Sequence, residues 1–329
     1  MEPYLSSLPK EITNLIFEDL DFKSKLRFMA TSLYYNASMI ITDLTNILFQ
    51  YLELLSDVIL AQQKYLSVTT LNASNNRHVS DVSHMTNLKI LHAYGSCGIS
   101  QLSISNLDLI ELCATNNPRI SDVSHMSQLR ILGAAGRCGI DQKGIANLNL
   151  IRFDATQNSR IFDVSHMTSL KILQASRGCT INQEGIAGLN LIELYISDNL
   201  HITNISHLTN LQVLHAGDNN RIGQKDMVNL NLTELNACNN NHILDISHMS
   251  NLVILDASGS CGIDQKSISR LNLYNLVACD NNRISDVSHM SKLRALWASG
   301  DCGIDQKGIS NLKLVHLYFC KNNKISQKQ

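Results

Sequence analysis

The sequence predicts an α/β solenoid in which short parallel strands stack side by side, preceded by a small N-terminal helical region. Three observations predict this fold class. A string of the form Asp-Val-Ser-His-Met returns with a constant 41-residue step, a shorter leucine pattern occurs twice in each step, and the segment 1–66 carries neither pattern. Repeats with a period of about 20 to 50 residues are typical of solenoids, in which each repeat buries its apolar face against its neighbours.

The longer repeat is recognised by its Ser-His dipeptide. The string occurs six times at constant spacing, and its fourth copy reads Asn-Ile-Ser-His-Leu. A constant spacing over six copies predicts one structural unit that is used repeatedly. The six copies begin at Asp81, Asp122, Asp163, Asn204, Asp245 and Asp286.

The shorter pattern, L-x-x-L-x-A-x-x-N-x-x-I, divides each step into two repeats of nearly equal length, about 20 residues each. Side chains two positions apart on a strand share a face, so Leu at the fourth position and Ala at the sixth predict the inward side of a short strand. Stacked copies would bury these side chains in one continuous core. The thirteen copies begin at Val68, Leu88, Leu109, Leu129, Leu150, Leu170, Leu191, Leu211, Leu232, Leu252, Leu273, Leu293 and Leu314.

The ninth position of the short pattern carries Asn in eight copies. A short amide side chain can satisfy backbone groups where a strand turns away, and such groups need partners when they are buried. We therefore expect a row of structural asparagines at the strand ends. The predicted row is Asn76, Asn117, Asn158, Asn199, Asn219, Asn240, Asn281 and Asn322.

The short pattern resembles leucine-rich repeats, and the resemblance extends from about Val68 to Ile325. It implies a leucine-rich-repeat solenoid over residues 67–329, with a parallel β-sheet on the concave face. Because each repeat is short for this class, at about 20 residues, the convex side has room for one helical or 3₁₀ turn. The resemblance also implies a protein that binds another protein along the sheet.

Composition disfavours several other functions. A net charge of -1 and a pI near 6.8 argue against a broad basic surface for nucleic acid or anionic lipid. Residues 1–10 carry Glu2, Pro3 and Pro9 where the apolar core of an export signal would begin, and polar residues interrupt the apolar stretch at 38–60. We expect a monomeric cytoplasmic protein without membrane or nucleic-acid partners.

Six histidines and five cysteines recur with the 41-residue step. Equivalent residues lie two strands apart, about 9.5 Å, which exceeds the separations that a shared zinc ion or a disulfide requires. We expect packing histidines on the convex side, small buried thiols and no metal or cofactor. The two rows are His84, His125, His166, His207, His248 and His289, and Cys97, Cys138, Cys179, Cys261 and Cys302.

No group of residues breaks the repeat in a way that would place a nucleophile beside a base, so the sequence predicts a binding protein and not an enzyme. The fifth strand position faces the concave surface and changes at nearly every copy, and neutral drift of an unconstrained row is one explanation. A binding surface is the other, because the row includes Trp297, the only Trp. With the third position, the predicted target-binding residues are Glu193, Tyr195, His215, Glu234, Asp256, Trp297, His316 and Tyr318.

The N-terminal region has helical periodicity, with apolar residues on one face over 5–20 and on a second over 26–33. A cap that covers the first strand of the solenoid is the simplest role. Within residues 1–40, the strings Leu8-Pro9-Lys10-Glu11-Ile12 and Ile16-Phe17-Glu18-Asp19-Leu20-Asp21 resemble an F-box. Residues 41–66 would then form a helical linker and N-terminal cap.

The F-box resemblance implies docking on the Skp adaptor of a cullin-RING ubiquitin ligase through an apolar surface. The chain is similar to F-box/leucine-rich-repeat proteins of large DNA viruses of amoebae. This likeness implies a substrate receptor in the ubiquitin pathway, located in the host cytoplasm if the protein is viral. The alternative is a stand-alone binding scaffold with a helical cap, since the Asp-Val-Ser turns are similar to those of internalin-like arrays. The residues expected to contact the adaptor are Leu8, Pro9, Ile12, Ile16 and Phe17.

Overall fold

The computed structural model describes residues 43–44 and 68–326, and the chain forms two compact units, residues 1–148 and 149–329. In the first unit, β1 (Asp43–Leu44) pairs in parallel with β2 (Thr70–Asn72). Next in the same parallel ladder are β3 (Ile90–His92), β4 (Glu111–Cys113) and β5 (Ile131–Gly133).

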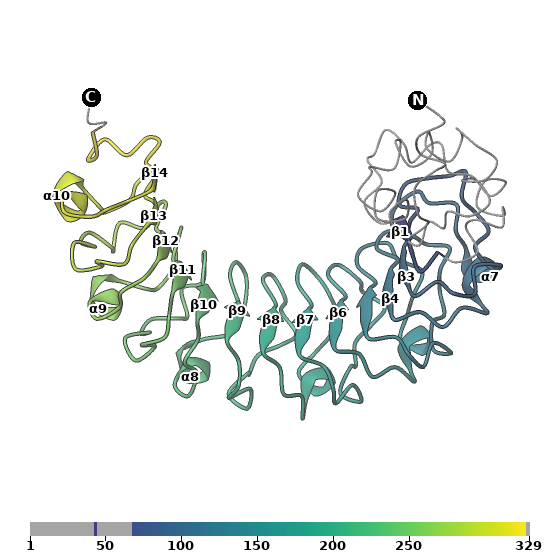
Figure 1. Cartoon of the computed structure of the whole chain (residues 1–329). Coiled ribbons are helices and arrows are strands. Elements are labelled where there is room, and N and C mark those ends of the chain that lie inside the picture. Colours follow the sequence, from purple (N-terminus) through teal and green to yellow (C-terminus); the bar gives the residue numbers. More distant parts are fainter. Residues whose placement is uncertain (1–42, 45–67, 327–329) are drawn as a thin grey trace, which may run out of the picture. The chain divides into compact units, whose positions relative to one another are not determined.

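The second unit continues the same design. Its strands pair in parallel with their chain neighbours, and they line the inner side of a curved array (Figure 1). The unit contains β6 (Arg152–Asp154), β7 (Ile172–Gln174), β8 (Glu193–Tyr195), β9 (Val213–His215), β10 (Glu234–Asn236), β11 (Ile254–Asp256), β12 (Asn275–Val277), β13 (Ala295–Trp297) and β14 (His316–Tyr318). The predicted parallel leucine-rich-repeat ladder is thereby confirmed.

Each 41-residue step contributes one short helical turn, and α8, α9 and α10 lie on the outer side of the second unit (Figure 1). Side chains cap the starts of four of these turns. Asp264 accepts a hydrogen bond from Ser267 N at 3.0 Å and Asp305 accepts one from Gly308 N at 2.9 Å, and Asp141 and Asn182 make the equivalent bonds. The turns are α7 (Gln101–Ile104), η2 (Lys143–Ile145), η3 (Glu184–Ile186), α8 (Gln224–Met227), α9 (Gln265–Ile268) and α10 (Gln306–Ile309).

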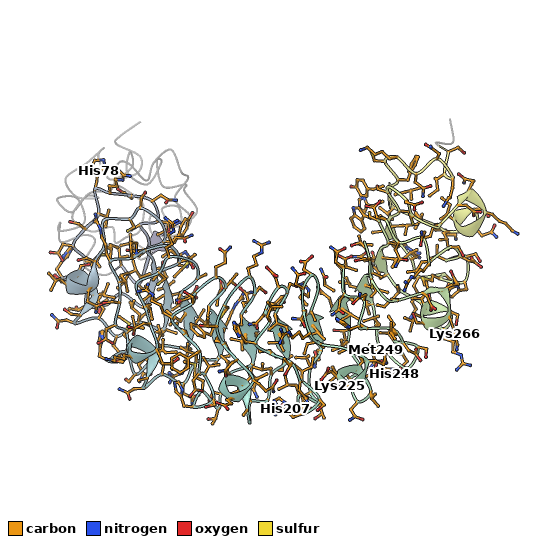
Figure 2. All side chains as sticks on the ribbon, turned by 180° about the vertical axis from the view of Figure 1, so that it is seen from behind. His78, His207, Lys225, His248, Met249 and Lys266 are labelled. Atoms are coloured by element: carbon orange, nitrogen blue, oxygen red, sulfur yellow. The ribbon has the colours of Figure 1, made fainter. Side chains whose placement is uncertain are left out.

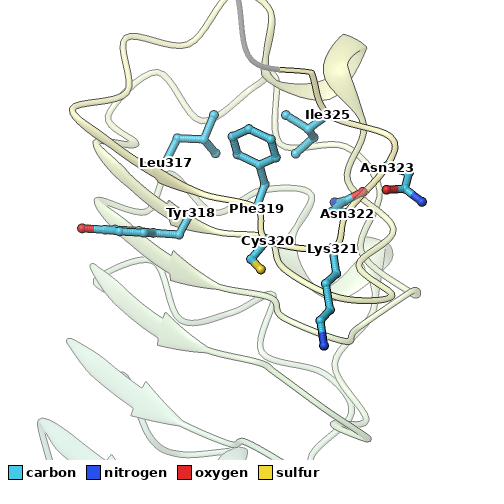
Figure 3. A pocket seen from close by; sticks show the side chains of 8 residues that line it. All are labelled: Leu317, Tyr318, Phe319, Cys320, Lys321, Asn322, Asn323 and Ile325. Atoms are coloured by element: carbon cyan, nitrogen blue, oxygen red, sulfur yellow. The ribbon is translucent and has the colours of Figure 1, made fainter.

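The core consists of the predicted inward positions. Leu or Phe at the fourth position is at most 1% exposed from Leu71 to Leu296, and the Ala or Ile at the sixth position is fully buried from Ala73 to Ala298. At the last strand, Leu317, Phe319 and Ile325 border a hollow of about 610 Å³, whereas the Tyr318 ring points away from these three side chains (Figure 3). Tyr318 therefore lies on the solvent-exposed face of β14 and not in the core.

The eighth position shares one backbone conformation in all thirteen repeats, with φ between 55° and 69°. This left-handed conformation turns the chain out of the strand, and Gly, Asn and Asp tolerate it best. At Gly95 a Cβ would also overlap the Asn75 amide oxygen of the preceding repeat. The positions are Asn75, Gly95, Asn116, Gly136, Gln157, Arg177, Asp198, Asp218, Asn239, Gly259, Asp280, Gly300 and Lys321.

The asparagine row forms as predicted in most copies. Asn240 is 1% exposed, donates through Nδ2 to Ala216 O at 2.7 Å and Ile222 O at 3.1 Å, and accepts from His242 N at 2.9 Å. These bonds tie each repeat to the one before it. Asn117, Asn199, Asn281 and Asn322 make the equivalent bonds.

The prediction is wrong for one member of the asparagine row. Asn219 is exposed, and its neighbour Asn220 is the buried amide that donates to Ile196 O at 2.7 Å and accepts from Ile222 N at 2.8 Å. Asn219 and Asn220 lie in the second repeat of a 41-residue step. In these second repeats the buried side chain is at the tenth position, and other copies have a buried Cys there, such as Cys179 or Cys261. Asn220 occupies that cysteine position.

The predicted N-terminal helical region lies outside the described residues, apart from β1. These two residues form a strand against β2, where a helical linker was expected over 41–66, because a parallel strand can satisfy the backbone groups at the edge of β2. The adaptor-contact residues and the boundary at 66–67 stay predictions. Within the described residues, no helix is long and apolar enough to cross a membrane.

Candidate binding surface on the strands

The third and fifth positions of each repeat, which are the first and last residues of its strand, face away from the core and lie in register across the second unit. Tyr195 pairs with Gln174 on one side and with His215 on the other, and Trp297 pairs with Tyr318. Side chains in one row are therefore about 4.8 Å apart along the sheet. The predicted target-binding residues occupy these two rows. Some of them form two separate groups, and within each group the side chains contact one another.

The first group, which we name the Tyr195–His215 cluster, comprises Glu193, Tyr195, His215 and Glu234. The Tyr195 hydroxyl donates to Glu193 Oε2 at 2.9 Å, and His215 Nε2 lies 2.8 Å from Glu234 Oε1. The Tyr195 and His215 rings meet edge-on with centroids 4.6 Å apart. All four side chains are half-buried, so neighbouring strands hold them in place while leaving them open to solvent.

The carboxylates of this cluster affect the Tyr195 phenol. Burial, the hydrogen bond to Glu193 and the negative charges of Glu193 and Glu234 together raise the pKa of Tyr195 to about 12. The hydroxyl therefore stays protonated at neutral pH and keeps donating to Glu193. The cluster is a fixed, negatively charged surface with an aromatic centre.

The second group, the Trp297–Tyr318 pair, consists of two stacked rings on β13 and β14. Their centroids are 5.3 Å apart and the ring planes differ by 12°. Tyr318 is 51% exposed and Trp297 is half-buried. Stacking on the neighbouring strand limits the rotamers of both rings, and an aromatic side chain held in this way loses little entropy when a partner covers it.

The remaining predicted residues lie outside these groups. Asp256 accepts hydrogen bonds from Ser258 Oγ at 2.5 Å and from Asn236 Nδ2 at 3.2 Å, so Asn236 joins the surface although it was not predicted. His316 is exposed on β14. Val277 occupies the fifth position between Asp256 and Trp297 and separates the charged part of the row from the aromatic part.

The first unit repeats part of the arrangement. His92 Nε2 lies 3.3 Å from Glu111 Oε1 on the next strand, as His215 and Glu234 do in the second unit. This pair was not among the predicted site residues. Its signal in the sequence is the spacing, since both members precede their counterparts by three of the 41-residue steps.

The recurring histidines lie on the outer side, as expected, and Figure 2 shows His207 and His248 there in the second unit. His248 Nε2 lies 3.0 Å from Met227 O, and His289 Nε2 lies 3.2 Å from Ile268 O. These contacts join each repeat to the preceding one, which is the packing role that we predicted. Among the residues that the structure describes, no group of three or more His, Cys, Asp or Glu is arranged to hold a metal ion.

The cysteines that recur with the 41-residue step are buried free thiols. Burial raises the pKa of Cys97, Cys179 and Cys261 to about 11, because an apolar environment disfavours the thiolate. These side chains fill space beside the strand ends and are poor nucleophiles. Cys320 is exposed instead.

Comparisons with known proteins identify the fold class. No protein-family model matches the chain, and no curated protein sequence matches it. An internalin, InlF, from Listeria monocytogenes is similar in structure, with a TM-score of 0.54, 24% identity, and coverage of 81% of this chain and 85% of the internalin. A chain of the Rad7–Elc1 complex in yeast has a TM-score of 0.56 at 13% identity, with coverage of 93% and 92%. The fold is that of a leucine-rich-repeat solenoid.

Proposed function

We propose that the chain is a protein-binding receptor that captures a target protein on the strands of its second unit. One observation carries this proposal: the Tyr195–His215 cluster and the Trp297–Tyr318 pair are ordered by neighbouring strands, exposed to solvent and not needed for the core. Tyr and Trp are frequent anchors at protein interfaces. A protein of this fold also occurs in a two-protein complex, that of Rad7 and Elc1.

In its specific form, the proposal is a substrate receptor of an SCF-type cullin-RING ubiquitin ligase. The F-box-like strings at Leu8–Ile12 and Ile16–Asp21 support it, since they would dock on a Skp adaptor while the strands hold the target. The receptor would raise the local concentration of target near the ligase, and other subunits would make and break the bonds. A stand-alone binding scaffold is the second candidate, which the structural similarity to an internalin favours.

Adaptor binding separates the two candidates. We expect the full chain to co-purify with the Skp adaptor, and Leu8→Asp or Ile12→Asp to abolish that binding because each buries a charge in an apolar interface. The matched control is Leu102→Asp, which changes a leucine that is 83% exposed on α7. If the unchanged chain does not bind the adaptor but still captures a target, the substrate-receptor proposal is wrong and the stand-alone scaffold remains.

Photo-crosslinking tests target capture on the strands. A photoreactive phenylalanine analogue at Val277, between the two groups, should crosslink a target in cells, whereas the same analogue at Lys266 on the outer side should not (Figure 2). The crosslinked protein is then purified and its affinity measured. Trp297→Ala and Tyr318→Ala should each weaken binding by about 2 kcal/mol or more, about 30-fold. Tyr94→Ala, an exposed tyrosine of the first unit, should leave the affinity unchanged.

A further inference from the structure

Charge is distributed unevenly over the binding surface of the second unit. The strands and the turns that follow them in four consecutive repeats, residues 191–199, 211–219, 232–240 and 252–260, contain five carboxylates and no Lys or Arg. The whole chain, by contrast, has nearly equal numbers of both signs, 28 acidic and 27 basic residues. The carboxylates of this acidic area are Glu193, Asp198, Asp218, Glu234 and Asp256.

The partners of these carboxylates are hydrogen-bond donors without a fixed positive charge. Glu193 accepts from the Tyr195 hydroxyl, Asp256 accepts from Asn236 and Ser258, and Glu234 contacts the imidazole of His215. In the described part of the chain, no Lys or Arg forms an ion pair with any of the five. The donors orient the carboxylates, and no Lys or Arg side chain of the described residues neutralises their negative charge.

Positive charge bounds the acidic area on one side. Arg152 is the first residue of β6 and the third position of its repeat, and Lys171 and Arg177 flank β7. The positive charge of Arg152 lowers the pKa of Tyr195, whereas the negative charges of Glu193 and Glu234 raise it. The net effect of the surroundings of Tyr195 is a raised pKa. The acidic character of the surface thus begins at β8 and does not extend over the whole unit.

The other side of the acidic area is apolar, and this is an independent observation. The Trp297–Tyr318 pair lies on β13 and β14. Tyr274 immediately before β12 is 51% exposed, and Val315 immediately before β14 is 68% exposed. Exposed large apolar side chains gathered at one end of the strands are typical of an interaction patch on a soluble protein. The folded chain does not cover this patch within the described residues.

We infer that the partner presents a segment with Lys or Arg side chains against β8–β11 and an apolar or aromatic side chain against β13 and β14. This inference rests on the proposed function, since it names the chemistry of the captured protein. From β9 to β13 the sheet advances four strands, about 19 Å, which an extended peptide spans with about six residues. A basic pair and an apolar anchor separated by about six residues fit both areas at once, and electrostatic attraction would also speed their encounter.

Peptide selection tests this inference. A phage library of random 12-residue peptides is selected against the full chain, and enriched peptides are synthesised with a fluorescent label for anisotropy titration. We expect Lys or Arg about six residues from Leu, Phe or Trp, with affinity falling as salt rises because the charges are solvent-exposed. The triple variant Glu193→Gln, Glu234→Gln, Asp256→Asn should bind at least tenfold more weakly. These changes keep side-chain shape and one acceptor oxygen, and circular dichroism verifies the fold.

Glu184→Gln is the matched control, because Glu184 is exposed on η3 and should not affect binding. Peptides that lack Lys and Arg, or that bind the triple variant as well as the unchanged chain, would overturn the inference. If Trp297→Ala still abolished their binding, the proposed function would stand. Two outcomes would contradict both the inference and the proposed function. In the first, none of the enriched peptides depends on Trp297 or Glu234 for binding. In the second, a labelled single-stranded oligonucleotide binds this surface more tightly than any peptide.

Discussion

At the scale of single residues, two backbone positions define each repeat. The eighth residue adopts the left-handed conformation that ends the strand, and the buried amide that follows bonds to carbonyl groups of the preceding repeat. The sequence pattern identified the amide row because Asn recurs there. It did not identify the left-handed row, since Gln157, Arg177 and Lys321 occupy it as well as Gly, Asn and Asp, and no single residue type marks it.

Asn220 and Asn219 provide a matched pair at this scale. Asn220→Ala should lower the free energy of unfolding by about 1 to 3 kcal/mol, because the buried Ile222 N–H would lose its partner and the Ile196 carbonyl would keep only its bond from Asn199 N. Asn219→Ala should cost less than about 1 kcal/mol, since Asn219 is exposed and bonds only to Asp198 at 3.2 Å. Urea denaturation measures both, and equal losses would contradict the corrected register.

Thiol labelling tests burial residue by residue. Iodoacetamide at pH 8 should modify Cys320 in the folded protein and leave Cys97, Cys179 and Cys261 unmodified, because burial raises the pKa of these three to about 11 and blocks access. In urea above the unfolding midpoint, all nine should react. Peptide mass spectrometry identifies the sites, and early labelling of Cys179 or Cys261 would contradict the described core.

At the scale of elements, the Asp-Val-Ser-His turns are small hydrogen-bonded units that join one repeat to the next. Asp122 accepts from Ser124 Oγ at 2.7 Å and Ser124 N at 2.9 Å, and Asn204 makes the same two bonds with Ser206 in the fourth copy. The turn therefore needs an acceptor oxygen and not a charge. Its histidine adds the contact to a carbonyl of the preceding repeat.

Acid sensitivity follows from these turns. Hydrogen bonds from the following Ser lower the pKa of Asp122, Asp245 and Asp286, through the Ser hydroxyl first for Asp122 and the backbone N–H first for the other two. A carboxyl whose folded pKa lies below its unfolded value, about 3.9, stabilises the fold above that value and stops doing so as pH falls through the folded pKa. Stability should be level from pH 7 to about 5 and decline below about 4.

Asparagine at the same positions tests the origin of this decline. Asp122→Asn, Asp245→Asn and Asp286→Asn together should keep the fold at pH 7 and make the fall in urea midpoint between pH 5 and pH 3 smaller. The reverse change, Asn204→Asp, should make the fall larger, since it adds a titrating turn. An unchanged acid profile in both variants would show that other carboxyls determine the acid limit.

At the scale of the whole molecule, stability comes from neighbouring repeats that bury the same positions. Twelve of the thirteen repeats have Leu at the fourth position, and Phe153 is the exception and one of the largest fully buried side chains. Phe153 therefore places a larger side chain at an inward position that Leu fills in the other repeats. Such an array depends on close contact between neighbours and has no single central core.

Truncation of Phe153 measures this dependence. Phe153→Ala should cost about 3 to 5 kcal/mol, because it leaves a cavity between two repeats, whereas Phe153→Leu, the residue of the other repeats, should cost about 1 kcal/mol. Phe162→Ala is the control, since Phe162 is 52% exposed and its removal should cost about 0.5 kcal/mol or less. Urea midpoints give the ranking, and a Phe153→Ala cost similar to that of Phe162→Ala would contradict it.

From the sequence alone, the parallel ladder, its register and its core follow, because Leu and Ala recur at a period that only stacked strands can bury together. The two rows that face away from the core follow for the same reason. The tertiary structure decided which members of those rows interact: Tyr195 with His215, His215 with Glu234, and Trp297 with Tyr318. It also decided that Asn220, and not Asn219, lies inside. Contacts between rotamers on adjacent strands depend on small differences in position, and no repeating pattern of residue types encodes those differences.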